Sequence, residues 1–351
     1  MIDRSIFSLL VNGFSPLPSI SSQGMQSSER VKAAVKWLQQ AHTASGNLGI
    51  SKGYDLLRGT WSPAYPETTG YTIPTLLNIA GYLPQPELQS LALTLADQLI
   101  EIATTEGGVA HWQSQQNPRP VVFDTGQVIF GWLAAYKFSR QERYLMAACR
   151  AADWLITVQD PSGSWKQFQY LDVEKVIDTR VAWALAELSH LTGNNDYRRS
   201  AVKNCEWALT QQDTLGWYNR CSFREEEDPF THTLAYTAEG LLECGRLFGE
   251  SRFISSARLM ADALLYRQQP DGHLSSTFSP GWHATNSSRC LTGNCQMVIL
   301  RLQLYELTDV EEYQDAARKA NSFVAAVQRV VDKTPNIQGG IPGFISRSRI
   351  V

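Results

Sequence analysis

One motif recurs five times along this chain, and it constrains the fold more than any other feature. Each copy opens on a threonine and runs on as a mostly apolar helix of about four turns. The copies begin at Thr69, Thr125, Thr179, Thr233 and Thr292, which is one copy every 54 to 59 residues. Length alone suggests about two domains for 351 residues. A repeat of this period instead predicts one body built from stacked helical units.

A second helix follows each apolar one and carries apolar residues on one face only, at i, i+3, i+4 and i+7. Residues 142–158, 197–211 and 311–330 are examples. Each of these helices leads into a glycine turn, which suits a left-handed helix stop, and then into a short extended segment. The turn glycines are Gly46, Gly107, Gly163, Gly216, Gly272 and Gly339.

The alternation of these two kinds of helix predicts the architecture. A helix that is apolar all round must be buried, and a helix with one apolar face covers it. We therefore predict an all-α fold, an α/α toroid (six-hairpin barrel) of repeated helical hairpins. It has six outer helices, the first at residues 28–43, and five inner helices. The pattern ends after Gly343, so the last inner helix is missing. The toroid spans residues 28–343, between tails at 1–27 and 344–351.

Composition excludes several classes of protein. The net charge is −3 and the pI is about 6.1, which argues against nucleic-acid binding because that requires a basic face. No run approaches the roughly 18 apolar residues of a membrane span, and the short apolar stretch at 6–11 indicates a tail or docking segment. The six cysteines form no C-x-x-C pair and lack histidines at zinc spacing. We expect a reduced, cytoplasmic protein with no metal and no cofactor, and the oligomeric state stays open.

Four chemically active side chains stand where inner helices begin, and we expect these helix starts to gather at one mouth of the toroid. Asp124, Asp178 and His232 each directly precede a repeated threonine, and Glu67 lies two residues before Thr69. Paired carboxyl groups move protons at glycosidic oxygens, so these four are candidate catalytic residues. The alternatives are plain N-caps for the acids and a hydrogen-bonded core residue for His232.

Candidate substrate-binding residues belong to the same mouth. Arg180 lies one turn into an apolar helix and needs a partner, either a substrate carboxylate or Asp124. The chain has ten tryptophans, and those on the extended segments either stack on sugar rings or plug the hairpin ends into the core. Asn294 and Gln296 interrupt an apolar helix, which fits a buried network or a ligand contact equally. The substrate-binding candidates are Tyr65, Tyr71, Trp112, Trp165, Arg180, Trp217, Asn294 and Gln296.

Several of these motifs together resemble a family of bacterial six-hairpin proteins associated with exopolysaccharide biosynthesis gene clusters. The resemblance is carried by residues 65–76, 124–128, 179–185 and 291–297, and it covers about residues 28–343. It implies a place among the six-hairpin glycosidase-like toroids, which include unsaturated uronyl hydrolases, glucuronyl epimerases and polysaccharide lyases. The family continues past Gly-Gly-Ile-x-Gly into one more helix that begins Asn-Trp-Ala, and this sequence departs from the family there.

A weaker resemblance points to isoprenoid chemistry. Residues 159–165 fit the Gln-x3-Gly-x-Trp repeat of squalene and hopene cyclases, and residues 163–180 resemble protein prenyltransferase β-chains. The catalytic Asp-x-Asp-Asp motif of the cyclases is absent from the sequence, and no Asp, Cys and His trio is placed for the prenyltransferase zinc. We interpret this as shared hairpin chemistry and not as a shared reaction.

These observations lead to three classes of function. The first is a hydrolase of the unsaturated-uronyl type acting on an acidic poly- or oligosaccharide in exopolysaccharide metabolism. In it Asp124 and Asp178 handle the proton and the water, and Arg180 holds the uronate. The second is a lyase or uronyl epimerase, in which Tyr65, Tyr71 or His232 is the base. The third is a non-catalytic glycan-binding or assembly protein, and an isoprenoid cyclase or prenyltransferase is a remote fourth.

Overall fold

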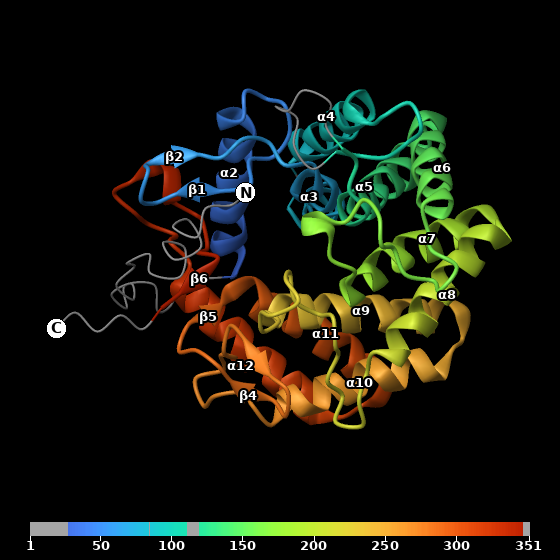
Figure 1. Cartoon of the computed structure of the whole chain (residues 1–351). Helices are drawn as coiled ribbons and strands as arrows, with labels where there is room; N and C mark the ends of the chain where they lie inside the picture. Colours follow the sequence, from blue (N-terminus) through green and yellow to red (C-terminus); the bar gives the residue numbers. More distant parts are fainter. Residues whose placement is uncertain (1–26, 84, 111–118, 347–351) are drawn as a thin grey trace.

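The computed structural model describes residues 27–83, 85–110 and 119–346 (Figure 1). Within these residues α-helices alternate between an outer and an inner layer, which confirms the α/α toroid. The outer layer consists of α2 (Ser27–Ala44), α4 (Pro86–Ile102), α6 (Glu142–Thr157), α8 (Asn195–Thr210), α10 (Ser251–Leu265) and α12 (Glu311–Val327). The inner layer consists of α3 (Pro66–Tyr82), α5 (Val122–Ser139), α7 (Thr179–Thr192), α9 (Thr231–Phe248) and α11 (Leu291–Thr308).

The two layers differ in burial as their compositions predict. In α9 fourteen of eighteen residues are buried, whereas in the outer helix α8 only six of sixteen are. Glycines let the inner helices approach closely. A Cβ on Gly240 would lie 2.3 Å from the carbonyl carbon of Thr179, and one on Gly70 would lie 2.7 Å from the carbonyl oxygen of Gln127. Helices packed this tightly hold the side chains at their ends in fixed positions.

The hairpin ends are tied to the next outer helix by one repeated device. Gln159 donates from Nε2 to the carbonyl oxygen of Gly163 at 2.9 Å and to that of Ser200 in α8 at 3.0 Å. Gly163 has a φ of +95°, and a Cβ there would lie 2.3 Å from the carbonyl oxygen of Lys203, so only glycine fits. The Gln-x3-Gly pattern therefore has a structural role in this chain. The same bridge joins Gln212 to Gly216 and Ser256, and Gln268 to Gly272 and Ala316.

The outer layer also joins the two ends of the described chain. Successive inner helices pack together from α3 to α11, while α11 and α3 share no comparable packing within the described ranges. Beyond α12, Gln328 donates to the carbonyl oxygens of Arg30 in α2 at 3.0 Å and Gly339 at 3.1 Å. Trp37 of α2 donates from its indole nitrogen to the carbonyl oxygen of Asn336 at 3.0 Å. Figure 1 shows this red segment beside the blue α2.

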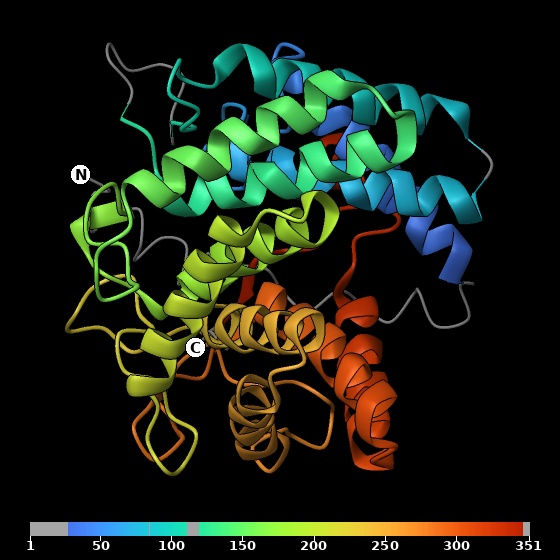
Figure 2. The same ribbon diagram turned by 90° about the vertical axis from the view of Figure 1, so that its right-hand side faces the viewer.

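The repeated threonines fasten the extended segments to the inner helices. Thr69 accepts a hydrogen bond from the backbone nitrogen of Ile50 at 2.9 Å, and Thr125 accepts one from that of Val109 at 2.9 Å. Figure 2 shows the long loops that lead into the inner helices gathered on one side of the ring. This side is the mouth that the sequence predicts.

Short elements complete the described fold. Three two-stranded antiparallel pairs and three 3-10 turns lie in the loops, and no helix in the described ranges is long and apolar enough to cross a membrane. All six cysteines carry free thiols. The strand pairs are β1 (Tyr54–Asp55) with β2 (Thr60–Trp61), β3 (Phe278–Ser279) with β4 (His283–Ala284), and β5 (Arg289–Cys290) with β6 (Phe344–Ile345). The 3-10 turns are η1 (Tyr170–Asp172), η2 (Val176–Asp178) and η3 (Pro335–Ile337).

Candidate active site

Two of the predicted carboxyl groups are buried where neighbouring inner helices begin. Asp124 lies in the first turn of α5 and is 2% exposed, and Asp178 directly precedes α7 and is 1% exposed. Glu67, in the first turn of α3, is half-buried. Asp178 occupies the N-cap position, but its side chain makes no capping hydrogen bond. The plain N-cap interpretation therefore does not describe Asp178.

The Asp178 carboxyl group is held on one side only. Gln169 donates from Nε2 to its Oδ2 at 2.6 Å, while Oδ1 is buried with no hydrogen-bond partner among the described residues. Burial raises the pKa of Asp178 to about 7, and the positive charge of Lys175 opposes that rise. A carboxyl group in this state can give up a proton near neutral pH, which is the property a general acid needs.

The loop before Asp178 is built around a buried lysine. Lys175 is 2% exposed and donates from Nζ to the carbonyl oxygens of Tyr170 at 2.5 Å and Val173 at 2.6 Å. Burial lowers the pKa of its amine to about 8. Leu171 in the same loop has a φ of +62°, a left-handed conformation that a bulky residue rarely adopts. The loop therefore holds Gln169 against Asp178 at the cost of local backbone strain.

A group of phenols surrounds Glu67 and Asp124. Tyr65 hydrogen-bonds Glu67, and the negative charges of Glu67 and Asp124 add to burial in raising the pKa of Tyr65 well above its usual range. Burial and Glu67 raise the pKa of Tyr71 in the same way. Burial raises the pKa of Tyr170, and the charge of Asp124 adds a smaller rise. These phenols are protonated at neutral pH and can donate hydrogen bonds, and the role of Tyr65 or Tyr71 as a base stays a prediction.

Arg180 has a different partner from the ones that the sequence suggested. Its Nη1 forms an ion pair with Glu239 of α9, and its Nε donates to Oε1 of Gln127 in α5 at 3.0 Å. The guanidinium group lies 4.5 Å from the ring centroid of Tyr236. The predicted pairing with Asp124 is replaced by Glu239, because α7 and α9 bring these two buried side chains together.

His232 lies in an aromatic wall at the start of α9. Its ring stacks on Phe230 at 5.5 Å and lies 5.6 Å from the ring of Phe223 and 5.8 Å from that of Tyr236. The Sγ of Cys290 lies 3.5 Å from Nδ1. Burial lowers the pKa of His232 to about 4, so the imidazole is neutral at pH 7 and is a weaker base than an ordinary histidine.

The predicted tryptophan platforms are mostly core residues. Trp165 is fully buried and donates from its indole nitrogen to the carbonyl oxygen of Leu155 at 2.9 Å. Trp217 is 5% exposed and packs edge-on against Trp282, with ring centroids 5.2 Å apart. The structure therefore favours the alternative in which these rings plug the hairpin ends, and Trp165 offers no free face to a sugar. Trp112 lies outside the described residues.

Asn294 and Gln296 have separate roles on α11. Asn294 is fully buried, accepts from the backbone nitrogen of Leu274 at 2.9 Å and donates to the carbonyl oxygen of Cys290 at 2.8 Å. It thus ties an extended segment to an inner helix, as Thr69 and Thr125 do elsewhere, and the buried-network alternative applies to it. Gln296 is half-buried, and its Oε1 has no partner in the described part of the chain.

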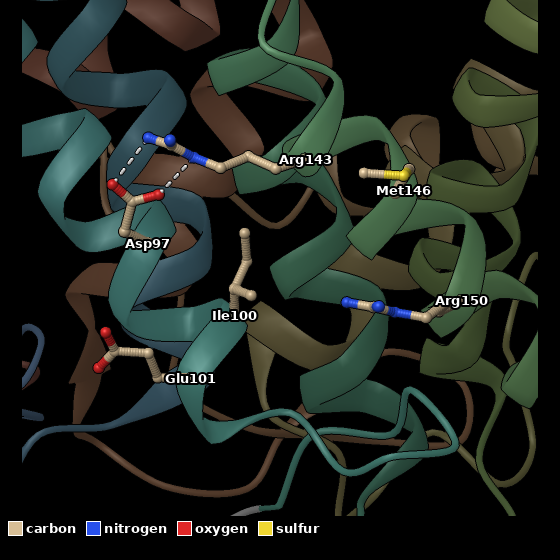
Figure 3. Close-up of a pocket in the computed structure, with 6 residues that line it drawn as sticks. All are labelled: Asp97, Ile100, Glu101, Arg143, Met146 and Arg150. Carbon is tan, nitrogen blue, oxygen red and sulfur yellow. Dashed lines mark hydrogen bonds and ion pairs between the residues drawn. The ribbon is translucent and has the colours of Figure 1, made fainter.

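A surface groove of about 430 Å³ lies away from all these residues, between the outer helices α4 and α6. Figure 3 shows Arg143 joined to Asp97 by two contacts, of 2.9 and 3.0 Å, with Arg150 on the same side and Glu101 opposite. None of the predicted site residues lines this groove. No group of three or more His, Cys, Asp or Glu side chains in the described ranges could hold a metal ion.

Several polar residues of the site were not predicted from the sequence. Gln169 and Lys175 lie in an irregular loop that has no periodicity to mark them. Tyr236 and Glu239 interrupt the fourth apolar helix, and this is the same signal that singled out Arg180 in the third. A search for every polar residue within an apolar inner helix would have found both.

Comparisons with known proteins agree with this architecture. Neither a family model nor a curated protein sequence matches the chain. Among solved structures, a cellobiose 2-epimerase from Bacillus thermoamylovorans has a TM-score of 0.71 at 11% identity, covering 91% of this chain and 90% of that one. A sugar epimerase from a ruminal bacterium has a TM-score of 0.73 at 12% identity over 91% and 89%. An unsaturated glucuronyl hydrolase from Bacillus sp. GL1 has a TM-score of 0.68 at 16% identity over 90% and 88%. At these identities the likeness shows the fold alone.

Proposed function

We propose that this protein is a saccharide-active enzyme, and that it hydrolyses a glycosidic bond in a uronate-containing oligosaccharide. The observation that carries the proposal is Asp178, a buried carboxyl group with a raised pKa, held through one oxygen by Gln169. A second buried carboxyl group, Asp124, lies at the start of the neighbouring inner helix. The fold shared with glucuronyl hydrolases and sugar epimerases supports the substrate class.

The two carboxyl groups divide the chemistry. Asp178, protonated at slightly acidic to neutral pH, gives its proton to the glycosidic oxygen as the carbon–oxygen bond breaks. Asp124 holds a water molecule and takes one of its protons as the remaining hydroxyl adds to the sugar. The proton from the water is then on Asp124, and Asp178 has lost its own proton. Proton exchange with solvent returns both carboxyl groups to their starting states. Tyr71 donates a hydrogen bond to the substrate, and Tyr65 donates to Glu67 and orients that carboxyl group.

The role of Arg180 in binding a uronate is constrained by its existing partners. Glu239 and Gln127 use Nη1 and Nε. A substrate carboxylate must therefore bind at Nη2 or take the place of Glu239. Binding at Nη2 keeps the buried ion pair intact and avoids the cost of leaving Glu239 buried without a partner.

An epimerase or lyase is the second candidate, and His232 is the observation that favours it. The His232 ring is unprotonated at neutral pH and lies in the aromatic wall at the start of an inner helix, where it can contact a sugar carbon, and two of the structural neighbours carry the name epimerase. In this reaction His232 is the base, and Arg180 stabilises the charge that develops on the substrate.

The first experiment follows the ultraviolet absorbance of unsaturated and saturated uronate oligosaccharides mixed with the protein. A hydrolase of the unsaturated-uronyl type removes the absorbance of the double bond, and a lyase creates that absorbance. An epimerase leaves the absorbance of both substrates unchanged but alters the sugar's NMR spectrum. Replacing the acids by D124N or D178N should lower hydrolysis by roughly 100-fold or more, while D315N, on an exposed outer residue, should not. If both site variants keep full glycan binding and the wild-type protein shows no turnover, the non-catalytic alternative stands.

A further inference from the structure

A second cleft lies on the mouth side of the ring, where the outer helix α10 ends. It has a volume of about 250 Å³ and lies between the end of α10 and the loop that contains β3 and β4. None of the residues that we assign to the candidate active site lines it. We call it the rim cleft, and its principal lining residues are Tyr266, Arg267, His273, Ser275, Asn286 and Ser288.

The chemistry of this lining fits a sugar better than an apolar ligand. Tyr266 is 81% exposed and presents a ring face to solvent beside hydroxyl, amide and guanidinium groups. Arg267 is a permanently charged lining residue, and the lining includes no carboxylate. Pockets for drug-sized ligands have volumes of roughly 300–1,000 Å³, so a cleft of about 250 Å³ suits a single sugar ring. The Asp271 carboxylate lies behind the lining, 2.5 Å from Nδ1 of His273, and Arg267 forms no ion pair among the described residues, so its charge favours an acidic ring such as a uronate.

Hydrogen bonds within the walls fix the cleft in its present shape. Asn286 accepts from the backbone nitrogen of Ser288 at 3.0 Å and from its Oγ at 2.8 Å, and Ser275 donates to the carbonyl oxygen of Asn286 at 2.8 Å. Arg267 donates from Nε to the carbonyl oxygen of Trp282 at 3.1 Å, which orients the guanidinium group. A site arranged in advance binds its ligand with less ordering cost.

Both walls of the rim cleft continue into the candidate active site. The backbone carbonyls of Ser275 and Ser276 accept hydrogen bonds from Thr231, the residue directly before His232. On the other side, Ser288 lies two residues before Cys290, whose Sγ contacts His232. A ligand in the cleft therefore lies against the same segments that position the aromatic wall around His232.

We propose that the rim cleft is a second saccharide subsite, which binds an acidic sugar unit of a longer chain whose reacting unit lies at the candidate active site. This inference rests on the proposed function. The inference extends that function by naming the substrate as an oligosaccharide that reaches beyond the reacting sugar. Tyr266 supplies the stacking face, and Arg267 supplies the charge.

Calorimetry with hyaluronan oligosaccharides of two and six sugar units, and a neutral glucan hexasaccharide, tests the subsite. The full-length D178N protein serves as the background so that no probe is consumed. We expect the hyaluronan hexasaccharide to bind at least about tenfold more tightly than the disaccharide. Y266A should remove that difference and leave disaccharide affinity unchanged. R267Q should weaken binding of the acidic hexasaccharide and leave the affinity for the neutral hexasaccharide unchanged.

The matched control is Y82A, because Tyr82 is 87% exposed at the far end of α3 and should affect no probe. Equal affinity for the short and long acidic probes, or hexasaccharide binding that neither Y266A nor R267Q changes, overturns the subsite and leaves the proposed function standing. No binding of any probe to either the wild-type or the D178N protein overturns both. A melting curve for each variant confirms that these surface changes leave the fold intact.

Discussion

Two buried charges lie two residues apart at the start of α7, and their surroundings differ. Arg180 has an ion pair with Glu239, a hydrogen bond to Gln127 and an aromatic ring against its face. Asp178 has one hydrogen bond, from Gln169, and its other carboxyl oxygen has no partner among the described residues. A matched buried charge holds a structure together, whereas an unmatched one has a shifted pKa and can do chemistry.

The largest effect should come from breaking the matched pair. Removing Glu239 leaves Arg180 buried without its counter-charge, so E239A should lower the free energy of unfolding by about 3–5 kcal/mol, measured by urea denaturation. The double replacement R180M/E239L removes both charges and should recover most of that loss. A single variant within about 1 kcal/mol of the wild-type protein would show that the pair is not structural.

The unmatched carboxyl group of Asp178 should make the protein less stable as pH rises. A carboxyl group in an ion pair has the opposite effect. Because the pKa of Asp178 is raised in the folded state, the folded protein binds more protons than the unfolded chain between about pH 4 and 7, and stability falls as pH rises through that range. D178N should therefore be about 2–4 kcal/mol more stable than the wild-type protein at pH 8.

At pH 4 the carboxyl group is protonated in the folded state and about half protonated in the unfolded chain, so D178N and the wild-type protein should differ in stability by less than about 1 kcal/mol. Urea denaturation at both pH values checks this, and D315N serves as the exposed control. A D178N protein that is less stable than the wild type at pH 8 contradicts the account of Asp178 as an unmatched charge.

Lys175 should lower the pKa of the unmatched Asp178 carboxyl group. Its positive charge lowers the pKa of Asp178, so K175M should raise that pKa and move the falling limb of the pH–activity profile to higher pH. Activity at pH 8.5 relative to the optimum should rise by roughly tenfold, which corresponds to about 1.4 kcal/mol. A profile of unchanged shape with lower activity throughout would instead assign Lys175 to holding the loop, through Tyr170 and Val173.

Replacing His232 should have the smallest effect on activity if the reaction is hydrolysis. In that case H232N changes the shape of the aromatic wall but removes no proton carrier, and kcat should fall by less than about tenfold. A loss of about 100-fold or more, together with a change in the sugar's stereochemistry catalysed by the wild-type protein, favours the epimerase. The measurement is kcat for H232N beside D178N on the same substrate.

The periodicity of the sequence predicted the toroid because it records which helix faces are buried. The last outer helix was expected at 311–330 but ends at Val327, where the backbone of Gln328 becomes extended and its buried side chain bridges Arg30 and Gly339. Periodicity cannot show that departure, because it depends on contacts with α2, almost 300 residues earlier in the chain.

The candidate site was predictable only where it follows the repeat. Asp124 and Asp178 stand at fixed places before the repeated threonine, so their burial at helix starts follows from the pattern. The partner of Arg180 does not follow from the pattern. Glu239 contacts Arg180 only because α7 and α9 pack closely at Gly240. Trp165 is buried with its indole nitrogen bonded to the carbonyl oxygen of Leu155, a contact that composition cannot reveal.

The central claim is that Asp178 is a buried carboxyl group that titrates near neutrality. It is tested most directly by following the ¹³C carboxyl resonance of Asp178 with pH, assigned by its loss in D178N. The account predicts a midpoint at about pH 7, together with loss of catalytic activity over the same range. A midpoint near the ordinary aspartate value of about 3.9 would contradict it.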